Sequence, residues 1–407
     1  MEDLRTLSLL NLTKALVPID RNILRSVTVG TDKLSDFYRV YYMDDYIANG
    51  GSAVRFVTGK KGSGKSHLLA LLCAEASEAG YKTVEVDASS VLLNDFTELY
   101  KAVFGAVDFR RVIQDVCQNL MRNMGFPQVD MGLDISAVDQ LSNMGQLDAL
   151  SRNELRARIR EISINNPFMD SNFAIIVSLL VSARTGLFRI DPSTEQRLMR
   201  WLEVDKTLSV TEFKQDGLLP YRINRYNARF MLRSFSELCK VAGYTGLFIA
   251  VDNLDSMLNS SSVSEIHYTK MRRDDTYESI RQLVDDVDSF RNFCIFFAMN
   301  SEMLINEKAG IKSYQALWLR IQNEIVTDCF NPFSSLLDMD KANKEYLTEE
   351  ALVEMSEKLC SMVHGIDIST SPISREKAAE IIRTARYGGN AVPYLVNHAT
   401  VGFVGRE

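Results

Sequence analysis

The sequence predicts an α/β protein with a parallel sheet between layers of helices. Four short apolar runs are separated by stretches of helical periodicity, which is the chain order of an α/β sheet. The later runs have no polar alternation, a pattern typical of parallel strands that are covered on both faces. The first run leads directly into a glycine-rich loop and then a helix, as in phosphate-binding proteins of this class. The four predicted strands are Val54–Thr58, Lys82–Asp87, Gly246–Val251 and Phe293–Met299.

The composition is that of a globular protein and gives no support to a membrane or to nucleic acid as a global partner. The chain has 407 residues, of which 46% are apolar and 24% charged, and its net charge is −7. A negative net charge does not attract nucleic acid to the surface as a whole. No apolar run reaches membrane-spanning length, and the first residues lack the shape of a signal peptide. The six cysteines form no CxxC pair and the four histidines are isolated, so we expect a reduced, cytoplasmic protein without a structural metal.

The first fifty residues are predicted to be helical with turns. An amphipathic pattern over Asp36–Tyr42 indicates a helix, which leads to the turn Asn49–Ser52. The first predicted strand follows this turn. We therefore expect residues 1–50 to form an N-terminal helical segment ahead of the sheet.

The segment Gly59–Ser66 has the form of a phosphate-binding loop, with two glycines five residues apart followed by Lys and Ser. Glycine lets backbone N–H groups turn inward around a phosphate, and the start of the next helix adds a partial positive charge. Lys65 is expected to reach the β- and γ-phosphates, and the Ser66 hydroxyl to bind Mg²⁺. The alternative is a glycine-rich turn that matches the motif by accident. The residues expected to contact ATP are Gly59, Gly62, Ser63, Gly64, Lys65, Ser66 and His67.

The middle of the chain carries helical patterns and no run that belongs to the sheet, so it is predicted to be a large helical insertion. Helical periodicity returns from residue 344 to the end, where Gly388 and Gly389 separate the last two helices. The predicted division is an N-terminal segment over 1–50, a phosphate-loop ATPase core over 51–94 and 241–335, a helical insertion over 95–240, and a C-terminal helical lid over 336–407.

Polar residues or glycine follow the predicted strands at their carboxyl ends, where ligands bind in parallel sheets. We expect Thr58-Gly59, Asp87, Asp252 and Asn300 to meet at one edge. Asp252 follows more than four apolar residues, as on the strand that holds Mg²⁺ in phosphate-loop enzymes. Mg²⁺ is therefore assigned to Ser66 and Asp252.

The residue after this aspartate raises the question of which group activates water. Many ATPases of the class have Glu at the position of Asn253, where it polarises the attacking water. Asn can orient a water molecule but cannot accept its proton. Asp255, two residues further along, and Asp87, on a neighbouring strand end, are the two candidate bases. Unless one of them serves, the sequence predicts tight nucleotide binding with slow hydrolysis.

Two further residues are candidates for contact with the γ-phosphate. Asn300 fits a sensor at a strand end, with a helix cap as the alternative. Arg320 fits an arginine finger that reaches a nucleotide on a neighbouring subunit, with a surface ion pair as the alternative. The catalytic candidates are thus Asp255, Asn300 and Arg320. ATP is favoured over GTP because the nearest match to a guanine-recognition loop, Asn343–Tyr346, lacks its Asp.

Four blocks of the sequence carry a resemblance to a known family: Gly50–Phe56, Arg200–Leu202, Gly243–Leu247 and Gly310–Leu317. Through such scattered blocks, between about Ala15 and Asn390, the chain resembles the BrxD-type ATP-binding proteins of BREX phage-defence systems. The resemblance implies an AAA-like ATPase, related to origin-binding initiators, that has a helical lid and acts in bacterial defence against foreign DNA. The implied partners are other defence-system proteins, with DNA and further copies of this chain as additional candidates and no membrane.

Two positions depart from the pattern of this family. The family usually has Asp-Glu where this chain has Asp252-Asn253. Its lid usually carries Gly-Gly-x-Pro-Arg-Glu, whereas the segment Gly388–Pro393 has lost the Arg. Both departures remove groups that act on the γ-phosphate, so the chain resembles a divergent member.

Three functions remain open on the sequence alone. The first is an AAA-like ATPase whose nucleotide state controls assembly with defence partners. The second is a nucleotide-dependent scaffold or switch with little turnover, and the third is a DNA-remodelling motor. Asn253 and the missing lid Arg favour the second over the third. Single-turnover hydrolysis separates the first two, and salt-dependent DNA affinity tests the third.

Overall fold

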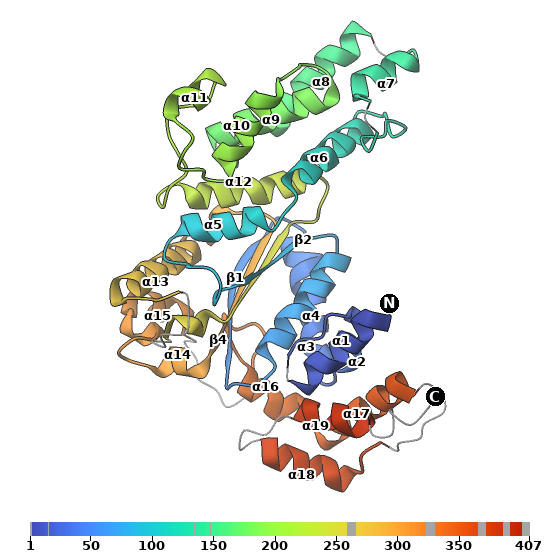
Figure 1. Ribbon diagram of the computed structural model, residues 1–407, viewed down its shortest axis with the longest axis vertical. Coiled ribbons are helices and arrows are strands. Elements are labelled where there is room, and N and C mark those ends of the chain that lie inside the picture. Colours follow the sequence, from blue (N-terminus) through green and yellow to red (C-terminus); the bar gives the residue numbers. More distant parts are fainter. Residues whose placement is uncertain are drawn as a thin grey trace.

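The chain forms a five-stranded parallel sheet with helices on both faces (Figure 1). The computed structural model describes residues 2–14, 16–133, 135–146, 148–258, 266–322, 330–364, 372–385 and 391–400. The strand order is β2-β3-β4-β1-β5, and every neighbouring pair is parallel. The predicted α/β class with a parallel sheet is therefore confirmed. The strands are β1 (Ser52–Gly59), β2 (Lys82–Asp87), β3 (Leu247–Asp252), β4 (Phe293–Asn300) and β5 (Leu336–Asp338).

The fifth strand was not predicted. It has three residues and pairs only with Phe56–Thr58 of β1. It lies inside the segment expected to begin the C-terminal lid, so the sheet extends to residue 338 instead of ending before residue 336. Three residues are too few to produce a periodic pattern, and pairing with β1 is what holds them extended.

Both faces of the sheet are buried, as the continuous apolar runs predict. On β4, Ile295 and Phe297 belong to one hydrophobic core, while Cys294 and Phe296 belong to another. Alternate residues of a strand point to opposite faces, so each face receives every second side chain. Phe297 stacks on Phe56 of β1 with ring centroids 5.6 Å apart. The central strands are therefore fixed by packing from both sides.

One face is covered by α4 (Lys65–Glu78) and by a π-helix, η1 (Tyr38–Ile47). The expected helix over Asp36–Tyr42 is thus divided between α3 (Asp32–Phe37) and η1. Five aromatic side chains between residues 37 and 46 pack in contact along this segment. The wider turn of a π-helix changes which residues share a face, which a helical-wheel pattern does not predict.

Eight helices follow one another between β2 and β3 and extend the molecule beyond one end of the sheet (Figure 1). In the described residues between β2 and β3 the structure has helices and no strand, and the division of the chain into a core and an insertion over 95–240 stays a prediction. Helices α5 to α11 each begin with an Asp or Ser whose side chain accepts a hydrogen bond from a backbone N–H of the first turn. The helices are α5 (Phe96–Gly105), α6 (Phe109–Asn123), α7 (Ala137–Asn143), α8 (Ala149–Ile162), α9 (Ser171–Thr185), α10 (Pro192–Leu202), α11 (Val210–Gln215) and α12 (Ala228–Val241).

Helices also follow β3 and β4. They cover the sheet face that also packs against α5 and α12. In the described part of the chain, none of the helices combines the length and the apolar character needed to cross a bilayer. The helices are η2 (Leu254–Leu258), α13 (Lys270–Asp285), η3 (Val287–Ser289), α14 (Ser301–Ile305), η4 (Ile311–Ser313) and α15 (Gln315–Ile321).

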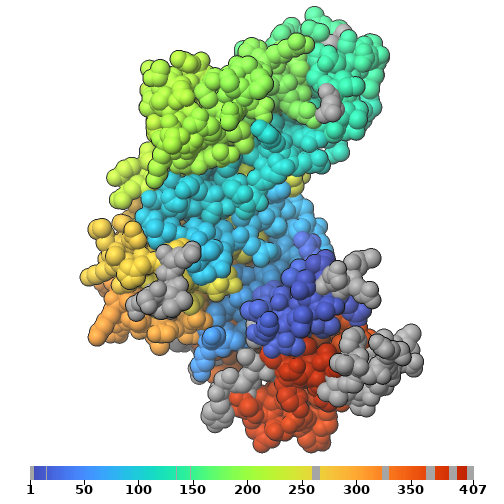
Figure 2. Space-filling model, viewed as in Figure 1, coloured from blue at the N-terminus to red at the C-terminus, as the bar shows by residue number. Residues whose placement is uncertain are grey.

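The two ends of the chain share a third hydrophobic core at the other end of the molecule. Leu12, Ile23 and Val29 pack there with Leu352 and Leu395. Figure 2 shows the N-terminal segment, in dark blue, against the C-terminal helices, in red. The predicted lid glycines, Gly388 and Gly389, lie outside the described residues. The helices are α1 (Glu2–Thr13), α2 (Arg21–Ser26), α16 (Met339–Tyr346), α17 (Glu349–His364), α18 (Arg375–Ala385) and α19 (Ala391–Ala399).

Candidate functional site

The carboxyl ends of the strands bring the predicted site residues to one edge of the sheet. Gly59 at the end of β1 is paired with Asn300 at the end of β4, and Asp87 at the end of β2 with Asp252 at the end of β3. Val251 is paired with Phe297, so β4 continues two residues beyond the level of Asp252. The chain that leaves β3 must therefore continue in the strand direction, by those two residues, before it can meet Asn300.

The loop Gly59–Ser66 lies between β1 and α4, as its motif predicts. Gly64 precedes α4 with φ of +89°, a left-handed conformation that favours glycine. A Cβ atom on Gly59 would lie 2.4 Å from the Oγ of Ser63. The loop is thus folded back on itself closely enough that glycine is required at its first position.

Two hydroxyl groups in this region fit a bound phosphate. The Oγ1 of Thr58 and the Oγ of Ser63 are buried and have no hydrogen-bond partner among the protein groups. An unsatisfied buried hydroxyl costs about 1–3 kcal/mol, so such groups are rare unless a ligand uses them. Phosphate oxygens accept hydrogen bonds from hydroxyl and backbone N–H groups. The loop therefore supplies donors of the kind that a phosphate ligand needs.

Lys65 is buried at the start of α4, with 8% of its surface exposed. Its Nζ donates to the carbonyl oxygens of Gly59, at 3.1 Å, and Lys60, at 2.9 Å. Burial lowers the pKa of Lys65, while the charges of Asp255 and Asp252 act to raise it. A cation held among loop carbonyls and two carboxylates lies where a phosphate and its metal ion would balance the charges.

His67 has a structural partner. Its Nε2 lies 2.7 Å from the Oγ1 of Thr28, which itself donates to the carbonyl oxygen of Leu24. The Thr28 hydrogen is thus used, so the imidazole N–H is the donor to Thr28. Burial lowers the pKa of His67 to about 4, so the ring is neutral at pH 7. This hydrogen bond ties the first turn of α4 to the N-terminal segment, and contact of His67 with ATP stays a prediction.

Asp255 and Asn300 form a closely bonded pair. The backbone N–H of Asn300 donates to Oδ1 of Asp255 at 2.8 Å, and its side-chain Nδ2 donates to Oδ2 at 2.5 Å. Asn300 occupies the N-cap position of α14, yet its side chain makes no capping bond. Its amide instead fixes the orientation of the Asp255 carboxylate. The pair lies beside the loop, because Asp255 is the first of the carboxylates that act on the charge of Lys65.

Asn253 is directed away from this pair. It has φ of +57°, its N–H donates to Oδ1 of Asp252 at 2.7 Å, and its Nδ2 donates to Oδ1 of Asp87 at 3.0 Å. Burial acts to raise the pKa of Asp87, but hydrogen bonds from Asn253 and Ser89 outweigh it, and the pKa is lowered. A carboxylate stabilised in its charged form is a weaker base. Asp87 is therefore a weaker base than an unperturbed aspartate, and which of the two candidates accepts a proton stays a prediction.

The groups proposed for Mg²⁺ are a hydroxyl, Ser66 at the start of α4, and a carboxylate, Asp252 at the end of β3. Oxygen donors of this kind suit a hard cation, and Mg²⁺ in nucleotide sites commonly takes one or two protein ligands beside phosphate oxygens. The described residues contain no cluster of three His, Cys, Asp or Glu side chains that would hold a metal by themselves. The donor set therefore fits Mg²⁺ that arrives with a nucleotide.

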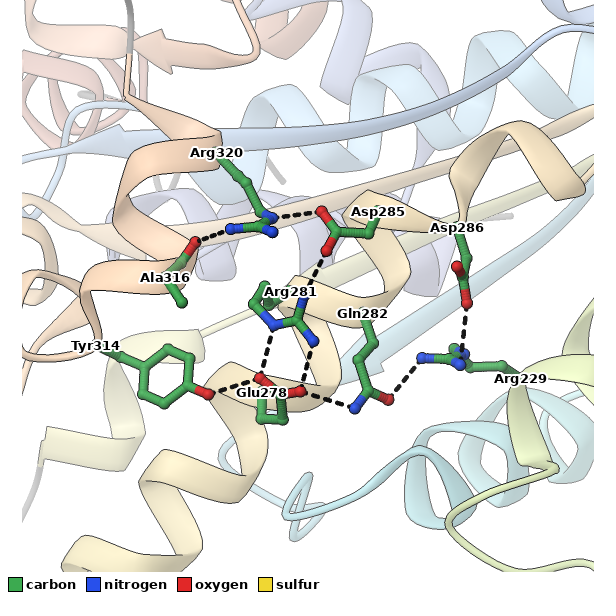
Figure 3. Close-up of polar contacts among 9 residues, drawn as sticks. All are labelled: Arg229, Glu278, Arg281, Gln282, Asp285, Asp286, Tyr314, Ala316 and Arg320. Carbon is green, nitrogen blue, oxygen red and sulfur yellow. Dashed lines mark hydrogen bonds and ion pairs between the residues drawn. The ribbon is translucent and has the colours of Figure 1, made fainter.

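Arg320 is engaged within its own chain. Its Nε donates to the carboxylate of Asp285, and its Nη1 donates to the carbonyl oxygen of Ala316 at 2.7 Å (Figure 3). Asp285 also pairs with Arg281, which forms a second ion pair with Glu278. The hydrogen bond from Arg281 is the main reason that the pKa of Glu278 is lowered to about 2. This is the carboxylate pairing that the sequence left as the alternative. A role as a finger toward a neighbouring subunit stays a prediction.

Two residues that contact the loop were missed by sequence reasoning. The carboxylate of Asp340 accepts from the backbone N–H of Lys60, and the Nδ2 of Asn343 donates to the carbonyl oxygen of Ser63 at 2.9 Å. Both lie on α16, 280 residues further along the chain. No local pattern indicates such a contact.

Comparison with known proteins identifies the family. The family model for the BREX system ATP-binding protein BrxC/D matches residues 8–392. No curated protein and no solved structure matches the chain. The matched segment contains the five strands of the sheet, the loop Gly59–Ser66 and the helices α5 to α12. The chain therefore belongs to the family of BREX system ATP-binding proteins BrxC/D.

Proposed function

We propose that this protein is an AAA-like phosphate-loop ATPase of a BREX phage-defence system, and that its nucleotide state controls its assembly with other proteins of that system. The observation that carries the proposal is the pair of buried, unsatisfied hydroxyls of Thr58 and Ser63, in and beside the loop that also holds Lys65. Family membership supports ATP as the ligand. The lack of an Asn-Lys-x-Asp loop supports ATP over GTP.

In this proposal the loop binds the phosphates and two oxygen donors bind the metal. The backbone of Gly59–Ser66 surrounds the phosphates, and Lys65 turns from the loop carbonyls to the β- and γ-phosphates. Ser66 and Asp252 hold Mg²⁺, which neutralises charge on the phosphates when it is bound. Burial lowers the pKa of Lys65, and the nearby charges of Asp255, Asp252 and Asp340 oppose that shift.

Asp255 is proposed as the general base for hydrolysis, with Asn300 as the residue that orients it. A general base must lie within hydrogen-bond reach of the water it activates, and this geometric requirement comes before any requirement on its pKa. The two hydrogen bonds from Asn300 give Asp255 one fixed orientation at the end of β4. Hydrolysis is expected to be slow, because the sequence lacks the lid Arg that relatives direct at the γ-phosphate.

The sheet order supports the AAA-like assignment. Because β4 lies between β1 and β3, Asn300 stands between the loop and the metal carboxylate of Asp252. A polar side chain there can contact both the γ-phosphate and the attacking water. We retain the division into a core, a helical insertion over 95–240 and a C-terminal lid as part of this proposal, with the core extended to include β5 (Leu336–Asp338).

The test is ATP binding and single-turnover hydrolysis by the purified full chain with Mg²⁺, alone and with duplex DNA at several salt concentrations. We expect binding with slow turnover, which Lys65→Ala abolishes. Binding without any turnover would support the scaffold or switch in place of the ATPase. Salt-dependent DNA binding that accelerates turnover would support the motor. No ATP binding by the wild-type chain would refute the proposal.

A further inference from the structure

Helix α16 holds the outer side of the loop Gly59–Ser66 with two side chains. The carboxylate oxygens of Asp340 lie 3.1 and 3.3 Å from the backbone nitrogen of Lys60. Three residues later, one turn along the same face, Asn343 donates to the carbonyl oxygen of Ser63 at 2.9 Å. Met339 lies against the first glycine, since a Cβ on Gly59 would be 3.1 Å from the Cβ of Met339. The helix thus contacts the loop at three points.

The same helix connects the sheet with the C-terminal helices. At its start, Asp338 of β5 accepts hydrogen bonds from the backbone N–H groups of Asp340 and Lys341, so α16 is fixed to the strand beside β1. At its end, the main chain of Tyr346 touches the N-terminal segment, where a Cβ on Gly30 would lie 2.3 Å from the Tyr346 oxygen. Residue 347 then packs in the core that joins the N-terminal segment with α17, α18 and α19. A displacement of α16 would therefore be passed to that core through the short connection between α16 and α17, which contains Leu347.

The negative charge of Asp340 acts on Lys65 inside the site. Asp255, Asp252 and, to the smallest extent, Asp340 act to raise the pKa of Lys65, which burial lowers. A carboxylate that attracts the Lys65 ammonium repels the phosphates that the same ammonium would bind. Because ATP carries more negative charge than ADP, the repulsion is larger for ATP.

We propose that Asp340 and Asn343 make α16 a sensor of the bound nucleotide: the triphosphate, repelled by Asp340, loosens α16 from the loop and thereby moves the C-terminal helices, whereas the diphosphate leaves the contact in place. This inference rests on the proposed function, since it assigns the regulation of the same site. It gives Asp340 a role in discriminating ATP from ADP, and it makes α16 the path by which occupancy of the loop reaches a surface that partners can bind.

The experiment measures dissociation constants for fluorescent ATP and ADP analogues with Mg²⁺ and compares two charge-removing variants of one helix. Asp340→Asn keeps the size of the side chain and removes the charge at the loop. Glu345→Gln is the matched control, because Glu345 is exposed on the same helix and makes no contact with the loop. We expect Asp340→Asn to bind ATP about threefold to tenfold more tightly, with a smaller gain for ADP and a smaller difference at high salt. Glu345→Gln should leave both constants unchanged.

Two further variants keep the inference falsifiable if Asp340→Asn folds poorly. Asn343→Asp places a new negative charge against the loop and should weaken ATP binding more than ADP binding. Asp340→Glu keeps the negative charge, so its ratio of the ATP and ADP dissociation constants should equal that of the wild type. In parallel, amide hydrogen exchange in the wild type should increase over Met339–Tyr346 with ATP and not with ADP.

The outcomes separate this inference from the proposed function. If the wild type binds ATP but Asp340→Asn and Glu345→Gln change the ATP-to-ADP ratio equally, the inference is wrong and the nucleotide site stands. The same holds if ATP and ADP leave exchange in α16 identical. If the wild type binds neither nucleotide, the proposed function itself is refuted.

Discussion

The assignment of Asp255 as the base is tested by Asp255→Asn. The change keeps the shape of the side chain, so one oxygen still accepts the N–H of Asn300, which is 2.8 Å away in the wild type. The second contact, now a 2.5 Å bond from Nδ2 of Asn300, would bring two N–H groups together. Losing one such hydrogen bond costs about 1 kcal/mol of folding free energy, which the fold is expected to tolerate. The amide cannot take a proton from water, so catalysis should fall far more than stability.

The expected loss follows from the contribution of general-base catalysis, which is roughly 10²- to 10⁴-fold. A loss of at least about 100-fold in the single-turnover rate corresponds to about 2.7 kcal/mol in activation free energy. The assay is single-turnover hydrolysis with excess protein and Mg²⁺, with the dissociation constant of ATP measured on the same sample. The ATP affinity should change little, because Asp255 is assigned to the water and not to the phosphates.

Asp87→Asn is the matched control, since it also replaces a strand-end carboxylate by an amide. Asp87 accepts from Asn253 at 3.0 Å and from the N–H of Ser89 at 2.9 Å, and these bonds hold its pKa low. We expect its rate to stay within about threefold of the wild type, the scale of a change outside the reacting centre. The reverse result, in which Asp87→Asn is inactive and Asp255→Asn retains its rate, would refute the assignment and place the base on β2.

Three further changes test the loop and its surroundings. Lys65→Ala should abolish detectable ATP binding because it removes the ammonium proposed to face the phosphates, and retained affinity in a binding titration would refute the site. Gly59→Ala should lower the free energy of unfolding by roughly 1–3 kcal/mol, because its Cβ would lie 2.4 Å from the Oγ of Ser63. Gly105→Ala is the control, because a Cβ on Gly105 has nothing within 4 Å, and it should be neutral in a thermal melt. Asn253→Glu would add a carboxylate beside Asp87, at a position with a left-handed φ. We therefore expect Asn253→Glu to raise turnover only when it is combined with Asp87→Asn. An increase in turnover in the single variant would contradict this expectation.

The sequence predicted the sheet well because the relevant signal is local. Three of the four predicted strands stand out as mainly apolar runs, and β2 (Lys82–Asp87) as an alternation of polar and apolar residues. The strand β5 has only Leu336, Leu337 and Asp338, which could equally begin a helix. The π-helix was missed for a related reason, since its tyrosines pack against Phe296 of the sheet and against Phe333, almost 300 residues away, and no local pattern indicates these contacts.

The candidate site was predictable in its motif and less so in its contacts. The loop and the strand-end residues follow from spacing and from the parallel sheet. The contacts of Asp340 and Asn343 with the loop join segments 280 residues apart, and no local pattern indicates these contacts. The partner of Arg320 had to be seen as well, because a guanidinium in a helical run offers the same sequence signal whether it pairs with Asp285 or faces another subunit.

The backbone conformation of Asn253 accounts for the contact between Asp255 and Asn300. β4 continues two residues beyond the level of Asp252, so the chain leaving β3 has to rise by that amount to meet Asn300. It does so through a left-handed residue, which Asn tolerates better than Glu, and through the 3-10 turn η2, which begins at Leu254. The turn that directs Asn253 to Asp87 is the same one that carries Asp255 to Asn300. The direction of Asn253 toward Asp87 and the Asp255–Asn300 pair are therefore two results of one local backbone conformation, which places a carboxylate beside Asn300 at the end of β4.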